Sequence, residues 1–352
     1  MIKKLTCSIF ILVCLALNQA LACTTFCLRG KGEVLFGRNY DWDIGDALIF
    51  VNKRGVAKMS AEESSRPARW VSRYGSVTFN QYGRENPTGG MNREGLVVEQ
   101  MWLDETQYSK DPALPTIGTQ DWMQYLLDTS ATTAEAIKNA ERVRIVTDVK
   151  VHYLVSDKNG DTAAIEFVGG KMVVHTGPSL PVATLTNDTY ENSIKAKAAA
   201  VGEQNSNGSL DRFVRAAQRT EAFSKQPKSG QEAVNYAFEV LSNAAQRPGT
   251  VWSIVYDIKR GWIYFRTAES PQIKSIDVKA FDYSCGTPVK MFDINARDSG
   301  DVTAKFAVYT RKANRDLIER SFNGTNFLKD IPAGFRNEMA AYPESFKCSQ
   351  SK

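Results

Sequence analysis

Histidine is scarce in this chain, which has only two, His152 and His175, among its 352 residues. Each lies in an alternating apolar run that predicts a strand, where a histidine usually has a structural role. The scarcity argues against Ser-His-Asp and Cys-His catalysis and against a metal site built from several histidines. If the protein is a hydrolase, its general base is not expected to be a histidine.

Other common signatures are missing as well. The chain has no Cys-x-x-Cys pair, which argues against a structural zinc site, and no glycine-rich segment with the spacing that cradles phosphates. Its formal net charge is only +5 and no block of Lys and Arg stands out, so a nucleic-acid partner is not expected. Beyond the first residues, no apolar run approaches the roughly 18 residues that indicate a membrane span.

The first 22 residues have the three parts of a secretory signal peptide. A positive start, Lys3-Lys4, precedes an apolar core at 9–17 and the small-x-small cleavage pattern Ala20-Leu21-Ala22. We therefore expect an exported protein, which is periplasmic if the source is Gram-negative and otherwise secreted. The remaining 23–352 are long enough for one large core and contain no evident linker, which favours a single domain.

Cleavage after Ala22 would make Cys23 the first residue of the mature protein. Such a cysteine carries a thiol and a free α-amine, so one residue can supply both nucleophile and base. A cysteine at this position can instead receive a lipid, which would block both groups and leave a lipid-anchored binding protein. Lipid-attachment sites usually have Leu three residues before the cysteine, whereas this chain has Ala20 there and Leu21 one residue later. The pattern favours ordinary cleavage.

Three other cysteines follow the leader. Cys27 would share a strand face with Cys23 and is expected to be a small buried core residue. Cys285 and Cys348 could form a disulfide in an oxidising compartment, but the sequence does not establish that they are close enough.

Neighbouring strands are expected to form hairpins. Strands are predicted at 23–28, 33–38, 50–51, 76–79, 96–103, 149–156, 162–168, 171–176, 182–186, 250–258 and 262–267. Helices are predicted around 122–126, at 132–141 behind the capping box Thr132-Thr133-Ala134-Glu135, at 210–224 and at 231–243. A polar loop is expected at 60–69, a surface excursion at 196–207, and short strands and polar loop towards the C-terminus. This order favours mostly antiparallel sheets with helices packed outside.

Five segments, in chain order, resemble the choloylglycine hydrolase family. They are Cys23-Thr24-Thr25-Phe26, Phe36-Gly37-Arg38-Asn39-Tyr40-Asp41-Trp42, Gly90-Met91-Asn92-Arg93-Glu94-Gly95-Leu96, Leu185-Thr186-Asn187 and Ser209-Leu210-Asp211-Arg212-Phe213. That family includes bile salt hydrolases and penicillin V acylases and belongs to the N-terminal nucleophile (Ntn) hydrolases. The resemblance implies an α+β fold, a four-layer αββα sandwich of two mostly antiparallel sheets, and an enzyme that hydrolyses linear amide C–N bonds.

The resemblance also implies roles around the nucleophile. Cys23 would attack the amide and its α-amine would act as the base, while Asp41 would hydrogen-bond and orient that amine. Arg38 and Arg212 would lie beside the thiol, where positive charge favours thiolate. From the residues alone, Arg38 and Asp41 could equally be a surface ion pair at the end of a hairpin.

The implied oxyanion hole has two donors, the side-chain amide of Asn187 and the backbone N–H of Trp102. The proline that commonly follows the family's oxyanion asparagine is missing, because Asn187 is followed by Asp188. No cofactor and no metal are required by this chemistry. The resemblance also implies a homotetramer.

Trp42 and Trp102 flank the expected site, either as core residues or as substrate contacts. In exported Gram-negative members, similar tryptophans accompany acylases for phenoxyacetyl or fatty acyl amides. We therefore expect small amphipathic N-acyl substrates of the penicillin V or N-acyl homoserine lactone type, ahead of conjugated bile salts. A cysteine dipeptidase is a further alternative, and the matching segments after residue 90 argue against it.

Overall fold

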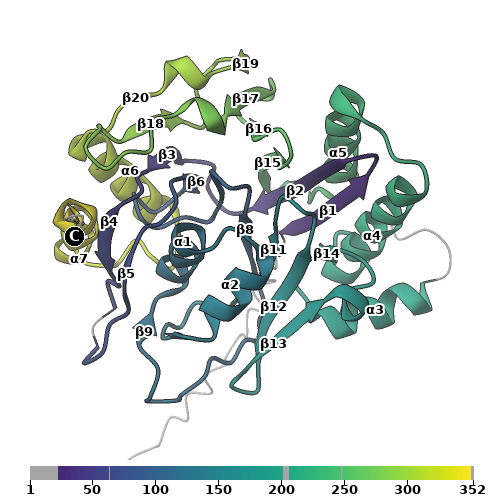
Figure 1. Cartoon of the computed structure of the whole chain (residues 1–352), viewed down its shortest axis with the longest axis horizontal. Helices are drawn as coiled ribbons and strands as arrows, with labels where there is room; N and C mark the ends of the chain where they lie inside the picture. Colours follow the sequence, from purple (N-terminus) through teal and green to yellow (C-terminus); the bar gives the residue numbers. More distant parts are fainter. Residues whose placement is uncertain (1–22, 63, 201–205, 247, 350–352) are drawn as a thin grey trace, which may run out of the picture.

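The computed structural model describes residues 23–62, 64–200, 206–246 and 248–349, so the expected signal peptide lies outside the described residues. Two large β-sheets form its centre (Figure 1). Neighbouring strands are antiparallel in both, except that β17 and β19 run parallel.

The first sheet has seven strands in the order β14-β1-β2-β15-β16-β17-β19. These are β1 (Thr24–Gly30), β2 (Glu33–Asp41), β14 (Thr184–Leu185), β15 (Thr250–Asp257), β16 (Trp262–Thr267), β17 (Lys274–Asp277) and β19 (Gly300–Asp301).

The second sheet has nine strands in the order β13-β12-β11-β8-β7-β6-β3-β18-β20. These are β3 (Leu48–Asn52), β6 (Ser76–Asn80), β7 (Gly89–Asn92), β8 (Val97–Trp102), β11 (Val151–Ser156), β12 (Thr162–Val168), β13 (Lys171–Thr176), β18 (Lys290–Asp293) and β20 (Ala307–Val308). Two small sheets contain β4 (Val56–Met59), β5 (Arg69–Val71) and β21 (Lys347–Cys348), and β9 (Thr116–Ile117) and β10 (Arg144–Ile145).

The α-helices pack outside the sheets. They are α1 (Thr119–Thr129), α2 (Thr133–Ala140), α3 (Tyr190–Ala199), α4 (Ser209–Lys225), α5 (Gly230–Ala244), α6 (Arg311–Gly324) and α7 (Ala333–Ala341). In the described part of the chain, no helix is both long and apolar enough to cross a membrane.

Side-chain alternation along the strands creates the layers. Residues such as Phe79 of the nine-stranded sheet and Tyr256 and Phe265 of the seven-stranded sheet meet between the two sheets. On the outer faces, α1 and α2 cover the nine-stranded sheet, and α4 and α5 cover the seven-stranded sheet. The result is a four-layer αββα sandwich, as expected.

The hairpin of β1 and β2 is specified locally. Lys31 and Gly32 both have positive φ, 48° and 78°, which matches the right-handed twist of a tight hairpin. The turn sets a register in which Thr25 pairs with Arg38 and Phe26 with Gly37. Gly37 has no room for a side chain, because a Cβ there would overlap the Phe26 ring.

The chain contains more helix than the sequence predicted. Helix α3 ends at Ala199, inside the expected surface excursion, and it buries only Tyr190 and Ser193. The short strands expected towards the C-terminus are present as β17 to β21, but helices α6 and α7 form where the sequence predicted no helix. In α6 the polar Asn314 and Ser321 occupy two of the five buried positions, which weakens the apolar periodicity that would have revealed the helix.

The cap of α2 also differs in detail. The Thr132 hydroxyl accepts from the Glu135 N–H at 3.2 Å, as expected. The Glu135 carboxylate, however, accepts from the Ala131 N–H at 2.8 Å and not from that of Thr132. The Glu135 side chain therefore binds the N–H one residue before the one that a capping box would use.

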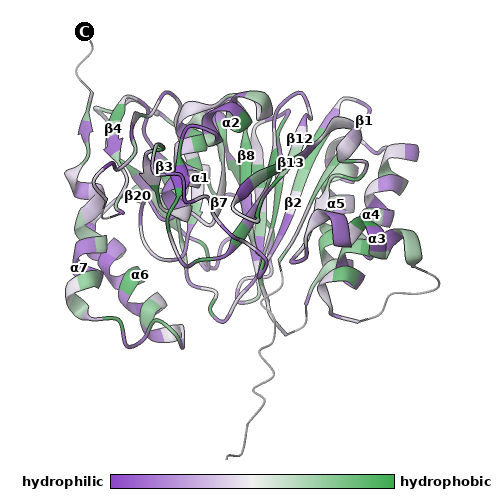
Figure 2. Cartoon of the chain, turned by 90° about the horizontal axis from the view of Figure 1, so that it is seen from below, coloured by the Kyte–Doolittle hydropathy of each residue, from purple (hydrophilic) through white to green (hydrophobic). Residues whose placement is uncertain are grey.

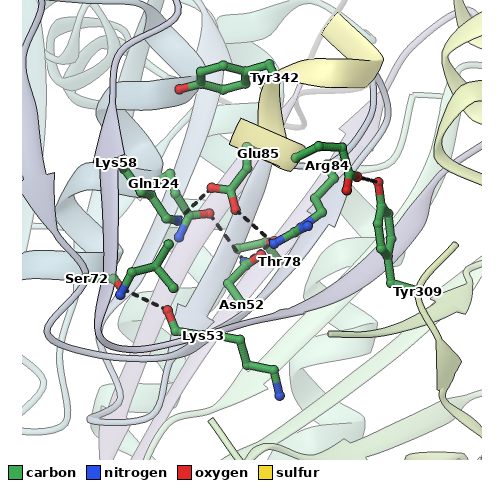
Figure 3. A network of polar contacts seen from close by, with 12 residues as sticks. Asn52, Lys53, Lys58, Ser72, Thr78, Arg84, Glu85, Gln124, Tyr309 and Tyr342 are labelled. Atoms are coloured by element: carbon green, nitrogen blue, oxygen red, sulfur yellow. Dashed lines mark hydrogen bonds and ion pairs between the residues drawn. The ribbon is translucent and has the colours of Figure 1, made fainter. Parts of the chain in front are cut away.

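A buried polar network attaches the C-terminal region to the strands (Figure 3). Lys58 lies between Glu85 at 2.6 Å and Asp128 at 3.0 Å. The Tyr342 hydroxyl, just after α7, donates to Asp121 at 3.0 Å. The backbone N–H of Arg84 donates to the side-chain oxygen of Asn314, in α6, at 2.7 Å.

Cys285 and Cys348 form a disulfide with their Cα atoms 5.7 Å apart. It closes a loop that contains both α6 and α7. These two helices lie at one end of the molecule, whereas α3, α4 and α5 lie at the other (Figure 2).

Candidate active site

The open end of the β1–β2 hairpin brings three of the expected site residues together. Cys23 directly precedes β1, and Arg38 and Asp41 belong to β2. The register pairs Thr24 with Asn39, so Cys23 lies next to the end of β2. All three side chains are buried, which rules out a surface ion pair at this hairpin end.

The Cys23 thiol is not a thiolate by default. Burial raises its pKa, and this effect exceeds the opposing influence of the Arg38 guanidinium and of the hydrogen bonds from Arg38 and the Asp41 backbone. A base is therefore needed to remove the thiol proton.

Arg38 is a fully buried cation with its own counterion. It forms an ion pair with Glu99 of β8 and donates to the carbonyl oxygens of Thr88 and Gln100, the latter at 3.1 Å. Burial alone would lower the pKa of Arg38, but the Glu99 carboxylate raises this pKa above its ordinary value. Arg38 thus stays charged beside the thiol. The sequence reasoning missed Glu99, although a charged residue inside the apolar run of β8 was a usable signal.

Asp41 has one satisfied oxygen and one unsatisfied oxygen. Its Oδ1 accepts from the Thr250 hydroxyl of β15. Its Oδ2 is buried and accepts no hydrogen bond from any residue that the structure describes. Burial raises the pKa of Asp41 to about 7. The site therefore offers an acceptor beside Cys23 that would suit a cationic N–H donor.

Asn187 and Arg212 join the loop after β14 to Cys23. The Asn187 Nδ2 donates to the carbonyl of Trp102 at 2.8 Å, and its Oδ1 accepts from Arg212 at 3.0 Å. Arg212, from the first turn of α4, also donates to the carbonyl of Cys23 at 2.7 Å and to the Thr24 hydroxyl at 2.8 Å. Arg212 thus holds the main chain of Cys23 and the Asn187 amide in one arrangement.

The backbone N–H of Trp102 faces the same side as Asn187. The Leu103 N–H donates to the carbonyl of Lys150, the residue before β11, so these two residues form a hydrogen-bonded pair that continues the antiparallel ladder. Because such pairs alternate, the N–H and C=O of Trp102 point away from β11. The Trp102 carbonyl on that side accepts from Asn187. The N–H is therefore available as a second donor there.

A cavity of about 620 Å³ opens at Cys23. Five of the seven expected site residues line it, namely Cys23, Arg38, Asp41, Trp42 and Trp102. Asn187 and Arg212 lie outside its lining. Both tryptophans are half-buried and face the cavity, so both are placed to contact a ligand there.

One wall of the cavity comes from the helices that the sequence did not predict. We call this the C-terminal wall, and it consists of Phe322, Phe327, Leu328, Ile331, Phe335 and Met339. Trp42 extends it, because its indole packs edge-on against the Phe327 ring at 6.2 Å and its Nε1 donates to Tyr82 at 2.7 Å. In the sequence, the only signal for this wall was the density of apolar residues between 322 and 339.

Comparison with known proteins identifies the family of this chain. The family model of linear amide C–N hydrolases, choloylglycine hydrolase family, matches residues 23–291. A penicillin V acylase of Pectobacterium atrosepticum is 27% identical over 336 residues, which cover 80% of this chain and 88% of that protein. A bile salt hydrolase/transferase of Lactiplantibacillus plantarum is 24% identical over 294 residues, which cover 69% of this chain and 88% of that protein.

Solved structures show the same fold. A penicillin V acylase from Agrobacterium tumefaciens superposes with a TM-score of 0.73 at 30% identity, covering 82% of this chain and 98% of its own. A conjugated bile acid hydrolase from Clostridium perfringens superposes with a TM-score of 0.65 at 19% identity, covering 77% and 96%, and supports the fold alone. The expected family is confirmed: this chain belongs to the choloylglycine hydrolase family and is a hydrolase of linear amide C–N bonds.

Proposed function

We propose that this chain is an exported acylase in which Cys23, at the start of the mature protein, cleaves small N-acyl amides that carry an apolar acyl group. The observation that supports this most directly is the position of Cys23 at a large cavity with an apolar wall. Ligand sites of this kind are mostly apolar with a few convergent polar groups, which here include Arg38 and Asp41.

The unsatisfied Oδ2 of Asp41 supports cleavage between Ala22 and Cys23. A free α-ammonium on Cys23 would give that buried oxygen a donor and would lower the pKa of Asp41 again, as a neighbouring cation does. A peptide bond at Cys23 would leave no amine to act as base. We therefore propose that the uncleaved chain is inactive.

The reaction proceeds in two steps. The Cys23 sulfur attacks the amide carbonyl carbon while its proton passes to the α-amine. The oxyanion binds the Trp102 N–H and the second N–H of the Asn187 amide, whose first N–H is taken by the Trp102 carbonyl. The C–N bond then breaks and the leaving amine takes the proton from the α-ammonium. Water, activated by the α-amine, hydrolyses the thioester and restores the thiol.

For the substrate, we propose N-acyl amides of the penicillin V or N-acyl homoserine lactone type. The uncharged C-terminal wall suits a phenoxyacetyl or fatty acyl group. Two of the similar proteins are named penicillin V acylases. Conjugated bile salts are the second candidate, supported by similarity to a bile salt hydrolase/transferase. From family resemblance alone we also propose a homotetramer, and from the signal-peptide pattern we propose that it lies in the periplasm or outside the cell.

The first test is the intact mass and N-terminal sequence of the protein purified from its own envelope. We expect an unmodified chain that starts at Cys23. A diacylglycerol or an acyl group on Cys23 would instead indicate the lipid-anchored binding protein.

Turnover is tested on penicillin V, acyl homoserine lactones and conjugated bile salts. Cys23→Ala should abolish activity on every substrate while thermal unfolding stays close to that of the wild type. Cys23→Ser should keep weak activity, because the α-amine survives but the nucleophile is poorer. Near-normal turnover by Cys23→Ala would refute the proposed nucleophile.

A further inference from the structure

A buried histidine and glutamate lie directly behind the Asn187 loop. His152 of β11 and Glu166 of β12 are both buried, and the strand register places them opposite each other. The His152 Nδ1 is 3.0 Å from the Glu166 Oε1, and its Nε2 is 2.7 Å from the carbonyl oxygen of Thr186. Both ring nitrogens therefore face oxygen atoms that can accept a hydrogen bond.

The carboxylate of Glu166 is built to stay ionised. Its Oε1 also accepts the Tyr190 N–H at the start of α3, at 2.9 Å, and its Oε2 lies 3.3 Å from the Nε2 of His175. Burial alone would raise the pKa of Glu166, but these hydrogen bonds and charges hold this pKa below its usual value. The His152 ring therefore bridges the Glu166 carboxylate and the carbonyl of Thr186, and both of these oxygens are acceptors.

The carbonyl that His152 contacts belongs to the peptide unit that joins Thr186 to Asn187. The N–H of the same unit donates to the hydroxyl of Ser209 at 2.9 Å. Because a peptide unit is planar, hydrogen bonds at its two ends fix its orientation and so fix the start of the Asn187 side chain. Asp188 follows Asn187 here, so no proline ring restrains this loop.

We propose that His152, held by Glu166, is a positioning residue for the oxyanion hole: it clamps the Thr186–Asn187 peptide unit and so aims the Asn187 amide at the reacting carbonyl. This proposal rests on the oxyanion role of Asn187 given above. Misplacement of a catalytic group by about 1 Å can cost about 100-fold in rate.

The kinetic test compares His152→Leu, which removes both contacts, with His152→Gln, which keeps one amide donor. In His152→Leu we expect kcat to fall about 10- to 100-fold with KM within about 2-fold of the wild type, because the lost interaction acts in the transition state. His152→Gln should recover part of that loss. Ser156→Ala, another buried polar residue of β11, controls for destabilisation of the strand and should leave kcat unchanged. A folded His152→Leu enzyme with wild-type kcat would refute the clamp.

The Asn187→Ala variant separates the two proposals. If Asn187→Ala keeps wild-type kcat, the oxyanion assignment itself is wrong. If its kcat falls about 100- to 1000-fold but His152→Leu has no effect, only the clamp is wrong. If both fall, His152→Leu should cause little further loss in the Asn187→Ala background, because both changes remove the same interaction.

Discussion

Asp41 is a buried carboxylate whose charge depends on the groups beside it. One of its oxygens is satisfied by Thr250, and the other accepts nothing from the described residues. The negative charge of Asp41 is therefore stabilised by few hydrogen bonds from the described residues. Cys23, which lies next to it, is outside any strand but is buried in the core.

This leads to a pH prediction for a chain that keeps residues before Cys23. Burial raises the pKa of Asp41 from 3.8 to about 7, so the folded state binds more protons than the unfolded state between these values. The stabilising effect is complete below about pH 4 and is lost as pH rises to about 7, by up to about 4 kcal/mol at about 1.4 kcal/mol per pKa unit. Chemical denaturation across pH 4–8 measures this slope.

The matched controls are Asp41→Asn and a chain that begins at Cys23. Asp41→Asn should remove the part of the pH dependence of stability that comes from the Asp41 carboxyl group. The chain that begins at Cys23 should show a smaller slope, because its α-ammonium stabilises the Asp41 carboxylate. Equal slopes in all three proteins would contradict the assignment.

Among the elements, the strand pair β4–β5 depends on a buried cation. Lys58 of β4 lies between Glu85 and Asp128, and all three side chains are almost completely buried (Figure 3). Lys58→Met should lower the free energy of unfolding by about 3–5 kcal/mol, because it leaves two carboxylates buried without their cation.

The control is Lys195→Met, which breaks the exposed pair with Glu191 on α3. We expect no measurable loss of stability from it, since solvent screens such pairs. Urea denaturation compares the two variants. Similar effects in both would show that the Lys58 network contributes no more than a surface pair.

Helices α6 and α7 and the turn between them carry the specificity prediction. Leu328→Ala and Ile331→Ala shorten the C-terminal wall without touching Cys23. Each should raise KM for a phenoxyacetyl or long acyl substrate by about 10-fold or more, with little change in kcat, because the loss of one to three buried methyl or methylene groups is worth roughly 1–3 kcal/mol.

Val308→Ala, at a half-exposed position on β20 outside the cavity lining, is the control and should leave KM unchanged. The comparison should include a short acyl chain, such as an acetyl amide, whose KM the wall should not affect. An equal rise of KM for acetyl and long acyl substrates would argue against acyl contacts at this wall.

For the whole molecule, the Cys285–Cys348 disulfide secures the end that carries the cavity wall. It joins residues 63 apart and encloses both C-terminal helices. A loop of this length predicts about 4 kcal/mol of stabilisation through the unfolded state. The Cys285→Ala/Cys348→Ala double variant should therefore unfold at a lower temperature, as should the wild type in a reducing agent.

The double variant is also the control for the reducing agent. Reduction should lower the melting temperature of the wild type but not that of the double variant, in which only the buried Cys23 and Cys27 remain among the described cysteines. An unchanged melting temperature in the double variant would mean that the polar network of Figure 3 holds the C-terminal end by itself.

Local chemistry made much of this molecule predictable. The Lys31-Gly32 turn, the alternation in β11 and β12, and the apolar spacing of α1 act between near neighbours, so hairpins and most helices follow from the sequence. The matching segments from Cys23 to Phe213 indicated the family and its αββα sandwich, and the family model and the superposed structures confirm both.

Tertiary packing decided what no local pattern specifies. The Glu99 partner of Arg38, the clamp on Asn187 and the C-terminal wall each join residues far apart in the chain, and their positions follow from how the layers stack. Weakly amphipathic helices such as α3 and α6 form because tertiary contacts stabilise them. The sequence thus determined the reaction class and indicated Cys23 as the candidate nucleophile, whereas the shape and polarity of the cavity at Cys23 depend on contacts that exist only in the folded chain.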